Sequence, residues 1–177
     1  GRTSRTNFTL RTSQTSSARS TGCAVSTICS VCTISSGWAL SSSISLWVFV
    51  LEDRKATPFG DVQSRNPINS VFSPDGRWVA YCSTESGRWE VYVRPASGEG
   101  GKWQVSAQGG EFARWSRAGN ALYYQERGKG VWTVPVKTAG GSFEVGRPEK
   151  LFDFAPGIQP DWDIAPDGSR FLMVQSE

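Results

Sequence analysis

Short runs of alternating apolar and polar residues, separated by turn-forming residues, fill the chain from Ser45 onward. The runs "RWVAYCS", "RWEVYVRP", "KWQVSA", "ALYYQE", "VWTVPV" and "RFLMVQ" are rich in aromatic and β-branched residues, and turn-forming residues separate them. No stretch of this region keeps a helical period over the length of an ordinary helix. The pattern therefore predicts an all-β fold.

One of these runs belongs to a repeat. The segments "FSPDGRWVAYCS" from Phe72, "WSRAGNALYYQE" from Trp115 and "IAPDGSRFLMVQ" from Ile164 align, so that the turn glycines coincide at Gly76, Gly119 and Gly168. A second series aligns on Trp47, Tyr92 and Trp132. A period of about 40–50 residues with four strands in each unit is typical of a β-propeller blade.

The repeat predicts an incomplete β-propeller with about two full four-stranded blades plus partial blades. The expected units are residues 45–66, 67–110, 111–158 and 159–177. Propellers close in rings of about 4–8 blades, so these units cannot close a ring by themselves. We therefore expect exposed blade edges, which favour self-association.

The Ser-Pro-Asp-Gly stretches fit tight turns, because Pro presets φ and Asp and Gly suit the later turn positions. Ala118 stands in the second copy where Asp75 stands in the first, so a metal role common to all copies is not expected. We assign a structural turn role to Pro74, Asp75, Gly76, Gly119, Pro166, Asp167 and Gly168.

Residues 1–44 have a different character. Residues 1–45 contain 13 Ser, 8 Thr and four Arg but no acidic residue. So little apolar surface predicts a disordered segment. A second interpretation is that the segment is not native sequence and derives from an out-of-frame stretch of coding DNA, while a weaker likeness is to an organelle transit peptide.

Composition excludes several classes of site. The chain has no histidine, which excludes Ser-His-Asp and Cys-His nucleophile systems, His-ligated zinc and the H-R-D loop of a protein kinase. Cys29-x-x-Cys32 has no second pair at metal-site spacing. We expect no catalytic residues, no metal and no cofactor. The longest apolar run, Leu46–Leu51, is too short to span a membrane.

The distribution of charge along the chain indicates which kind of binding partner to expect. The net charge of +3 comes from the first 45 residues, and residues 46–177 carry 15 basic and 16 acidic residues, a net of −1. This balance gives no reason to expect nucleic-acid binding. A protein or peptide partner is expected instead.

The first strand of each unit is the innermost of a blade, so ligand-facing residues are expected there. An alternative for Asp161 and Asp163 is that strand alternation turns Trp162 into the core and leaves both carboxylates outside. The candidate ligand-facing residues are Asn69, Glu111, Arg114, Asp161 and Asp163.

The text "FSPDGRWVAY", followed by "RWEVYVRP" and "KWQVS", resembles the TolB-like, WD-repeat-like β-propeller family over residues 45–177. With "LWVFVLEDRKATPF" and "DGSRFLMV" included, the chain is most similar to the C-terminal propeller of bacterial serine/threonine kinases of the eukaryotic-like kind. That resemblance implies a parent with a kinase domain, a membrane helix and a propeller outside the cytoplasm.

The sequence thus predicts a non-catalytic protein- or ligand-binding fragment, the sensor or interaction region of a signalling kinase or of a TolB-like envelope protein. An extracytoplasmic or periplasmic location follows from the resemblance alone. The alternative is the gating propeller of a prolyl-oligopeptidase-like serine peptidase, whose hydrolase domain is not in this chain.

Overall fold

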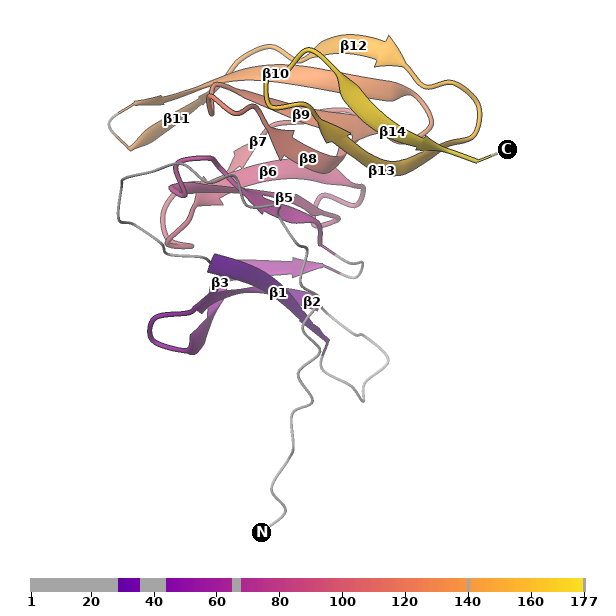
Figure 1. The fold of residues 1–177 in the computed structure, drawn as a ribbon. Helices are drawn as coiled ribbons and strands as arrows, with labels where there is room; N and C mark the ends of the chain where they lie inside the picture. The colour runs from indigo at the N-terminus through magenta and orange to yellow at the C-terminus, as the bar shows by residue number, and fades with distance from the viewer. Residues whose placement is uncertain (1–28, 36–43, 65–67, 140, 177) are drawn as a thin grey trace.

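The computed structural model describes residues 29–35, 44–64, 68–139 and 141–176, and each regular element in these ranges is a β-strand. The strands form antiparallel sheets that follow one another along the chain and stack in that order (Figure 1). In these ranges no helix has the length and apolarity of a membrane span. The all-β prediction is confirmed.

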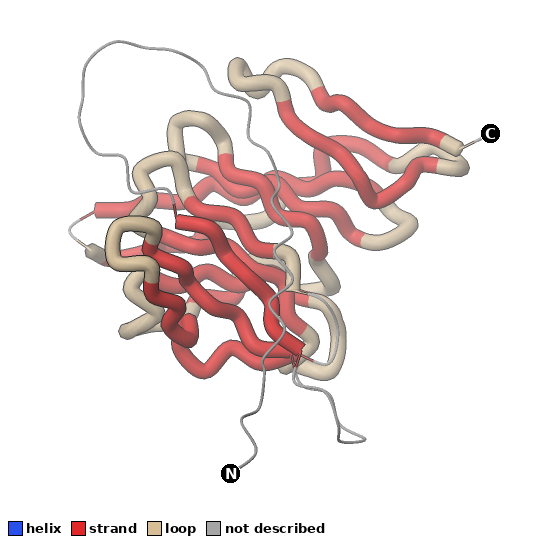
Figure 2. The backbone as a smooth tube through the Cα atoms, turned by 60° about the horizontal axis from the view of Figure 1, so that its bottom comes forward, coloured by secondary structure: helices blue, strands red, loops and turns tan. Residues whose placement is uncertain are grey.

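Four sheets, which we call blades 1 to 4, account for the strands (Figure 2). Blade 1 has the order β1 (Cys29–Ser35), β2 (Ile44–Val50), β3 (Lys55–Ser64). Blade 2 has the order β4 (Ser70–Phe72), β5 (Trp78–Ser83), β6 (Glu90–Pro95), β7 (Trp103–Gln104).

Blade 3 contains β8 (Glu111–Trp115), β9 (Ala121–Glu126) and the long β10 (Gly130–Ala139). The outer edge of β10 pairs with two strands in turn, β11 (Ser142–Val145) and β12 (Glu149–Asp153). Blade 4 consists of β13 (Ile158–Ile164) and β14 (Phe171–Gln175). Successive up-and-down sheets of this kind are the blades of a propeller, so the chain is an incomplete β-propeller.

Strand β1 lies inside the segment for which no regular structure is predicted. It pairs with β2 from Cys29 opposite Val50 to Ser35 opposite Ile44. The β-branched residues Val31, Thr33 and Ile34 favour an extended chain, and the apolar β2 offers it an edge. The prediction therefore does not hold over Cys29–Ser35, while residues 1–28 and 36–43 lie outside the described residues.

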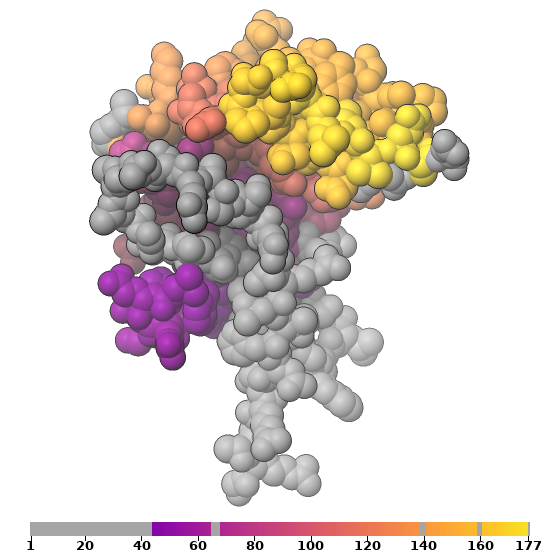
Figure 3. Space-filling model, in the orientation of Figure 1, coloured from indigo at the N-terminus to yellow at the C-terminus, as the bar shows by residue number. Residues whose placement is uncertain are grey.

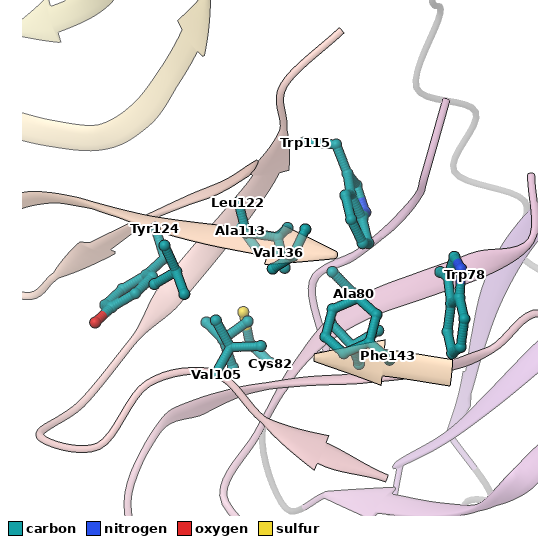
Figure 4. Close-up of a cluster of buried hydrophobic side chains, with 13 residues drawn as sticks. Trp78, Ala80, Cys82, Val105, Ala113, Trp115, Leu122, Tyr124, Val136 and Phe143 are labelled. Atoms are coloured by element: carbon teal, nitrogen blue, oxygen red, sulfur yellow. The ribbon is translucent and has the colours of Figure 1, made fainter. Parts of the chain in front are cut away.

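The blades are held together by apolar side chains between their faces. Alternate residues of β5 point to opposite sides, so that Ala80 and Cys82 face blade 3 while Val79 and Tyr81 face blade 1. The larger cluster lies between blades 2 and 3 (Figure 4) and joins Trp78, Ala80, Cys82, Val91, Val93, Val105, Ala113, Trp115, Leu122, Tyr124, Val134, Val136 and Phe143.

The three aligned turns have one backbone geometry. In the first, the Gly76 N–H donates to the Ser73 carbonyl at 2.9 Å and the Ser73 N–H donates to the Trp78 carbonyl at 2.8 Å. Equivalent bonds close the turns at Gly119 and Gly168, and the three glycines have φ of 70°, 70° and 72°. This left-handed conformation explains why glycine stands at the same place in each copy.

The side chains that fasten these turns differ between copies. Asp75 accepts hydrogen bonds from the Ser73 hydroxyl at 2.5 Å and from the Arg77 N–H at 3.1 Å. Burial opposes ionisation of Asp75, but these hydrogen bonds outweigh it and lower its pKa. In the second copy, which has Ala118, the Ser116 hydroxyl donates to Asn120 instead, at 2.9 Å.

We predict that Gly76→Ala lowers the free energy of unfolding by about 1 kcal/mol, because a Cβ in the left-handed region is strained. A Cβ at Gly76 would meet no atom within 4 Å, so the loss is backbone strain alone. Gly76→Asn is the control and should lose less, since Asn tolerates this region. Denaturant unfolding measures both, and equal stability of Gly76→Ala and the wild type would contradict the turn assignment.

A second prediction concerns Cys82, which is 1% exposed between blades 2 and 3. Burial raises the pKa of the Cys82 thiol to about 11. In a variant with Cys23, Cys29 and Cys32 changed to Ser, a thiol reagent near pH 8 should label nothing until denaturant is added. Rapid labelling of the native variant would show that blades 2 and 3 do not pack as described.

Candidate functional site

The inner strands that carry the predicted ligand-facing residues are neighbours. Strand β8 contacts both β4 and β13, so the first strands of blades 2, 3 and 4 lie side by side. Their polar side chains nevertheless point to different places, and the five predicted residues do not converge on one point.

Arg114 and the two aspartates are separated by the β13–β14 sheet. The Arg114 guanidinium lies over the Trp162 ring, 5.8 Å from its centroid, between blades 3 and 4. Trp162 is 2% exposed, whereas Asp161 and Asp163 are exposed on the other face of β13. The alternation with Trp162 turned inward is confirmed, and it keeps both carboxylates away from Arg114.

Asn69 and Glu111 have different surroundings again. The Asn69 backbone carbonyl accepts a hydrogen bond from the Cys82 N–H. The buried side-chain Oδ1 of Asn69 has no hydrogen-bond partner among the described residues. Glu111 forms a two-fold ion pair, accepting from Arg127 Nε at 3.0 Å and from Arg127 Nη2 at 3.1 Å. A register irregularity follows Glu111, and Phe112 beside it has a φ of 53°, a rare conformation for a bulky residue.

Glu111 belongs to a set of three paired glutamates, of which the sequence analysis singled out Glu111 alone. Glu90, the second, is fully buried at the start of β6. It accepts hydrogen bonds from Arg88 Nε at 2.6 Å, from the Ser106 hydroxyl and from the Gly109 N–H at 3.2 Å. Arg88 is also held by the Ala107 carbonyl, 2.6 Å from its Nη2.

Glu126, the third, is buried at the end of β9 and pairs with Lys129 Nζ three residues later. A carboxylate this deeply buried is costly unless a cation and hydrogen bonds satisfy it, which explains why each glutamate has its own base. The acidic member of each pair is inside, and its basic member reaches solvent: side-chain exposure is 61% for Arg88, 74% for Arg127 and 58% for Lys129.

The three pairs gather at one end of blades 2 and 3. The bases lie in the loops between β5 and β6 and between β9 and β10, while Glu90 begins β6, Glu111 begins β8 and Glu126 ends β9. Gly109, which donates to Glu90, lies so near Glu126 that a Cβ on it would be 3.8 Å from the Glu126 Cγ. Burial, together with the charges of Glu126 and Glu90, raises the pKa of Tyr124 to about 12. We call the exposed bases Arg88, Arg127 and Lys129 the basic rim.

The basic rim presents hydrogen-bond donors to solvent while its counter-charges are underneath. The bond to Glu111 raises the pKa of Arg127 further, so the guanidinium stays charged. The described residues contain no group of three or more His, Cys, Asp or Glu placed to hold a metal ion. The sequence signal that could have located these ion pairs is the short spacing of opposite charges around each turn. It occurs in "RWE" from Arg88 and in "ERGK" from Glu126.

No family model and no curated protein matches the sequence. Among solved structures, the chain is similar to TolB from Acinetobacter baumannii, with a TM-score of 0.50 and 13% identity over 83% of this chain and 41% of that one. It is also similar to an oligogalacturonate lyase solved in complex with manganese, with a TM-score of 0.51 and 15% identity over 77% of this chain and 37% of the lyase.

The chain therefore spans about two fifths of the length of these two proteins. At such low identity the likeness concerns the fold alone. Together with the succession of antiparallel sheets, it supports the fold of an incomplete β-propeller, similar to that of TolB.

Proposed function

We propose that the chain is a non-catalytic binding fragment of a β-propeller protein, and that its basic rim takes an acidic segment of a protein partner. The observation that carries the proposal is the arrangement of the three ion pairs, with buried glutamates and exposed bases. Carboxylates of a partner can reach Arg88, Arg127 and Lys129, because each base keeps donors that its own glutamate does not use.

A non-catalytic role is supported by what these side chains already do. General acid–base and nucleophilic catalysis need a titratable group that can reach the substrate. Glu90, Glu111 and Glu126 are buried and held by bases, and the sequence contains no histidine. The fold is shared by TolB and by a lyase, so the argument rests on the residues and not on the fold.

For the parent protein we propose the sensor or interaction region of a bacterial signalling serine/threonine kinase or a TolB-like envelope protein, on the sequence resemblance. The gating propeller of a prolyl-oligopeptidase-like peptidase is the alternative. The flanking genomic reading frame distinguishes these parents. A kinase core and a membrane helix upstream support the signalling kinase, and a G-x-S-x-G hydrolase domain downstream supports the peptidase.

The same DNA tests residues 1–44, which we propose to be non-native sequence. If the segment is out of frame, another frame of that DNA should encode a blade-like segment with a Ser-Pro-Asp-Gly turn. If no frame encodes one, the out-of-frame hypothesis is wrong.

The binding proposal predicts that a fluorescein-labelled hexaglutamate peptide binds the chain at low salt and is released as salt rises. A variant with Glu111→Gln, Glu126→Gln, Arg127→Gln and Lys129→Gln should bind it at least about tenfold more weakly. This variant removes two complete ion pairs, so the net charge is unchanged and no buried charge is left alone. Fluorescence anisotropy gives both affinities.

The matched control removes two ion pairs away from the basic rim, with Lys137→Gln, Glu144→Gln, Arg170→Gln and Asp167→Asn. Its affinity for hexaglutamate should stay within about twofold of the wild type. Equal losses in both variants, or no loss in either, would show that the basic rim is not the binding surface.

A further inference from the structure

The guanidinium of Arg127 in the basic rim is held along one edge by a single carboxylate. Its Nε donates to Glu111 Oε1 at 3.0 Å and its Nη2 donates to Glu111 Oε2 at 3.1 Å. The loop that carries Arg127 is tight, because the Lys129 N–H donates to the Glu126 carbonyl at 2.9 Å and Gly128 has a φ of 70°. The plane of the guanidinium is therefore fixed, and its other edge, formed by Nη1 and Nη2, faces away from Glu111.

The other two bases of the basic rim are held differently. Arg88 divides its bonds between two groups, because Nε donates to Glu90 at 2.6 Å and Nη2 donates to the Ala107 carbonyl at 2.6 Å. Lys129 ends in an ammonium group, which is a point charge on a rotatable stem and not a planar fork. Arg127 is therefore the base of this rim that is best placed to bind a planar anion by two parallel hydrogen bonds.

The place of Glu111 beneath this guanidinium depends on an extra residue in β8. Glu111 lies opposite Gln125 in β9, and three residues later Arg114 lies opposite Tyr123, which is only two residues from Gln125. Residues three apart in a regular strand point to opposite faces of the sheet. The extra residue is a β-bulge, and it places the side chains of Glu111 and Arg114 on the same face.

That shared face of blade 3 is the one covered by blade 4. The Arg114 guanidinium lies over the Trp162 ring, and Figure 3 shows the yellow residues of blade 4 against the orange residues of blade 3. In a regular strand Glu111 would face blade 2, as Ala113 does. Phe112 makes the reversal with a φ of 53°, a strained value for a bulky residue, and strain of this kind points to a functional constraint.

We propose that Arg127 anchors the acidic segment by binding one of its carboxylates through the Nη1–Nη2 edge, and that Glu111 is the positioning residue that holds this guanidinium for it. The inference rests on the proposed function and adds the ligand chemistry, a planar carboxylate bound by two parallel hydrogen bonds. Arg88 and Lys129 contribute positive charge without this geometry. A guanidinium that the protein already holds in place loses little freedom when the ligand binds, which favours affinity.

Two single variants of the full chain separate positioning from charge. Glu111→Gln and Glu126→Gln each remove one negative charge from beneath the basic rim, so charge alone would make both bind labelled hexaglutamate more tightly than the wild type. Glu126→Gln should do so. Glu111→Gln should bind at least about fivefold more weakly than the wild type, because an amide has one acceptor oxygen and cannot accept from both Nε and Nη2 of Arg127. Fluorescence anisotropy measures the three affinities.

A second pair of variants keeps the charge and removes a guanidinium. Arg127→Lys should bind hexaglutamate at least about fivefold more weakly at each salt concentration, whereas Arg88→Lys should lose only about twofold. The dependence of affinity on salt should be the same in both variants and in the wild type, because the number of charges is unchanged.

The outcomes separate this inference from the proposed function. If Glu111→Gln binds as tightly as Glu126→Gln, or if the two lysine variants lose equally, the inference is wrong while the basic rim remains the binding surface. If the wild type does not bind hexaglutamate at low salt, both are wrong. Protection of the Cys82 thiol from labelling shows for each variant that blades 2 and 3 remain folded, and if Glu111→Gln loses this protection the lysine pair decides.

Discussion

Each sheet of this protein has two faces that carry apolar side chains, so each blade depends on a neighbour at both sides. Blade 2 satisfies the constraint fully: Val79 and Tyr81 pack toward blade 1, while Ala80 and Cys82 pack toward blade 3. A single four-stranded sheet buries too little surface to be stable alone, and stacking is what gives the blades a common core. The position of each side chain, and also of each loop, follows from that stacking.

The stacking of the blades sets the positions of the loops. Because successive blades repeat the same up-and-down path, the loops between second and third strands fall at one end of the molecule in both blade 2 and blade 3. Those loops bring Arg88 and Arg127 to the same end, although they are far apart in the sequence. Burial of Glu90 and Glu111 beneath them fixes the bases in place, at a cost that the ion pairs offset.

Much of the fold can be predicted from the sequence, because alternation and turn residues are local signals. The strands at Trp78–Ser83 and Ala121–Glu126, and the repeat of turn glycines, follow from spacing alone. The strand at Cys29–Ser35 could not be predicted in this way, since its pairing with β2 is a contact between segments. Strand β11 is likewise fixed by the partner edge of β10 and not by a local pattern.

The candidate site is less predictable for the same reason. Glu111 and Asp163 lie in the first strands of blades 3 and 4, and Asn69 immediately precedes β4, but blade geometry does not say which face each side chain takes. Strand alternation sets the face on which the Asp163 side chain lies. For Glu111 a register irregularity next to Phe112 interrupts that alternation. The pairing of Glu111 with Arg127 joins residues on β8 and beyond β9, so only the folded hairpin brings them together.

The turn at Gly119 has the same backbone geometry as the turn at Gly76 but a different side-chain hydrogen bond. Here the partner of the serine hydroxyl has moved from the aspartate position to Asn120, while the backbone bonds and the glycine φ are the same as at Gly76. The hairpin therefore keeps its backbone geometry whether an aspartate or an alanine stands at the third turn position. A search for the Ser-Pro-Asp-Gly sequence alone would therefore miss the turn at Gly119 and undercount the blades of this chain.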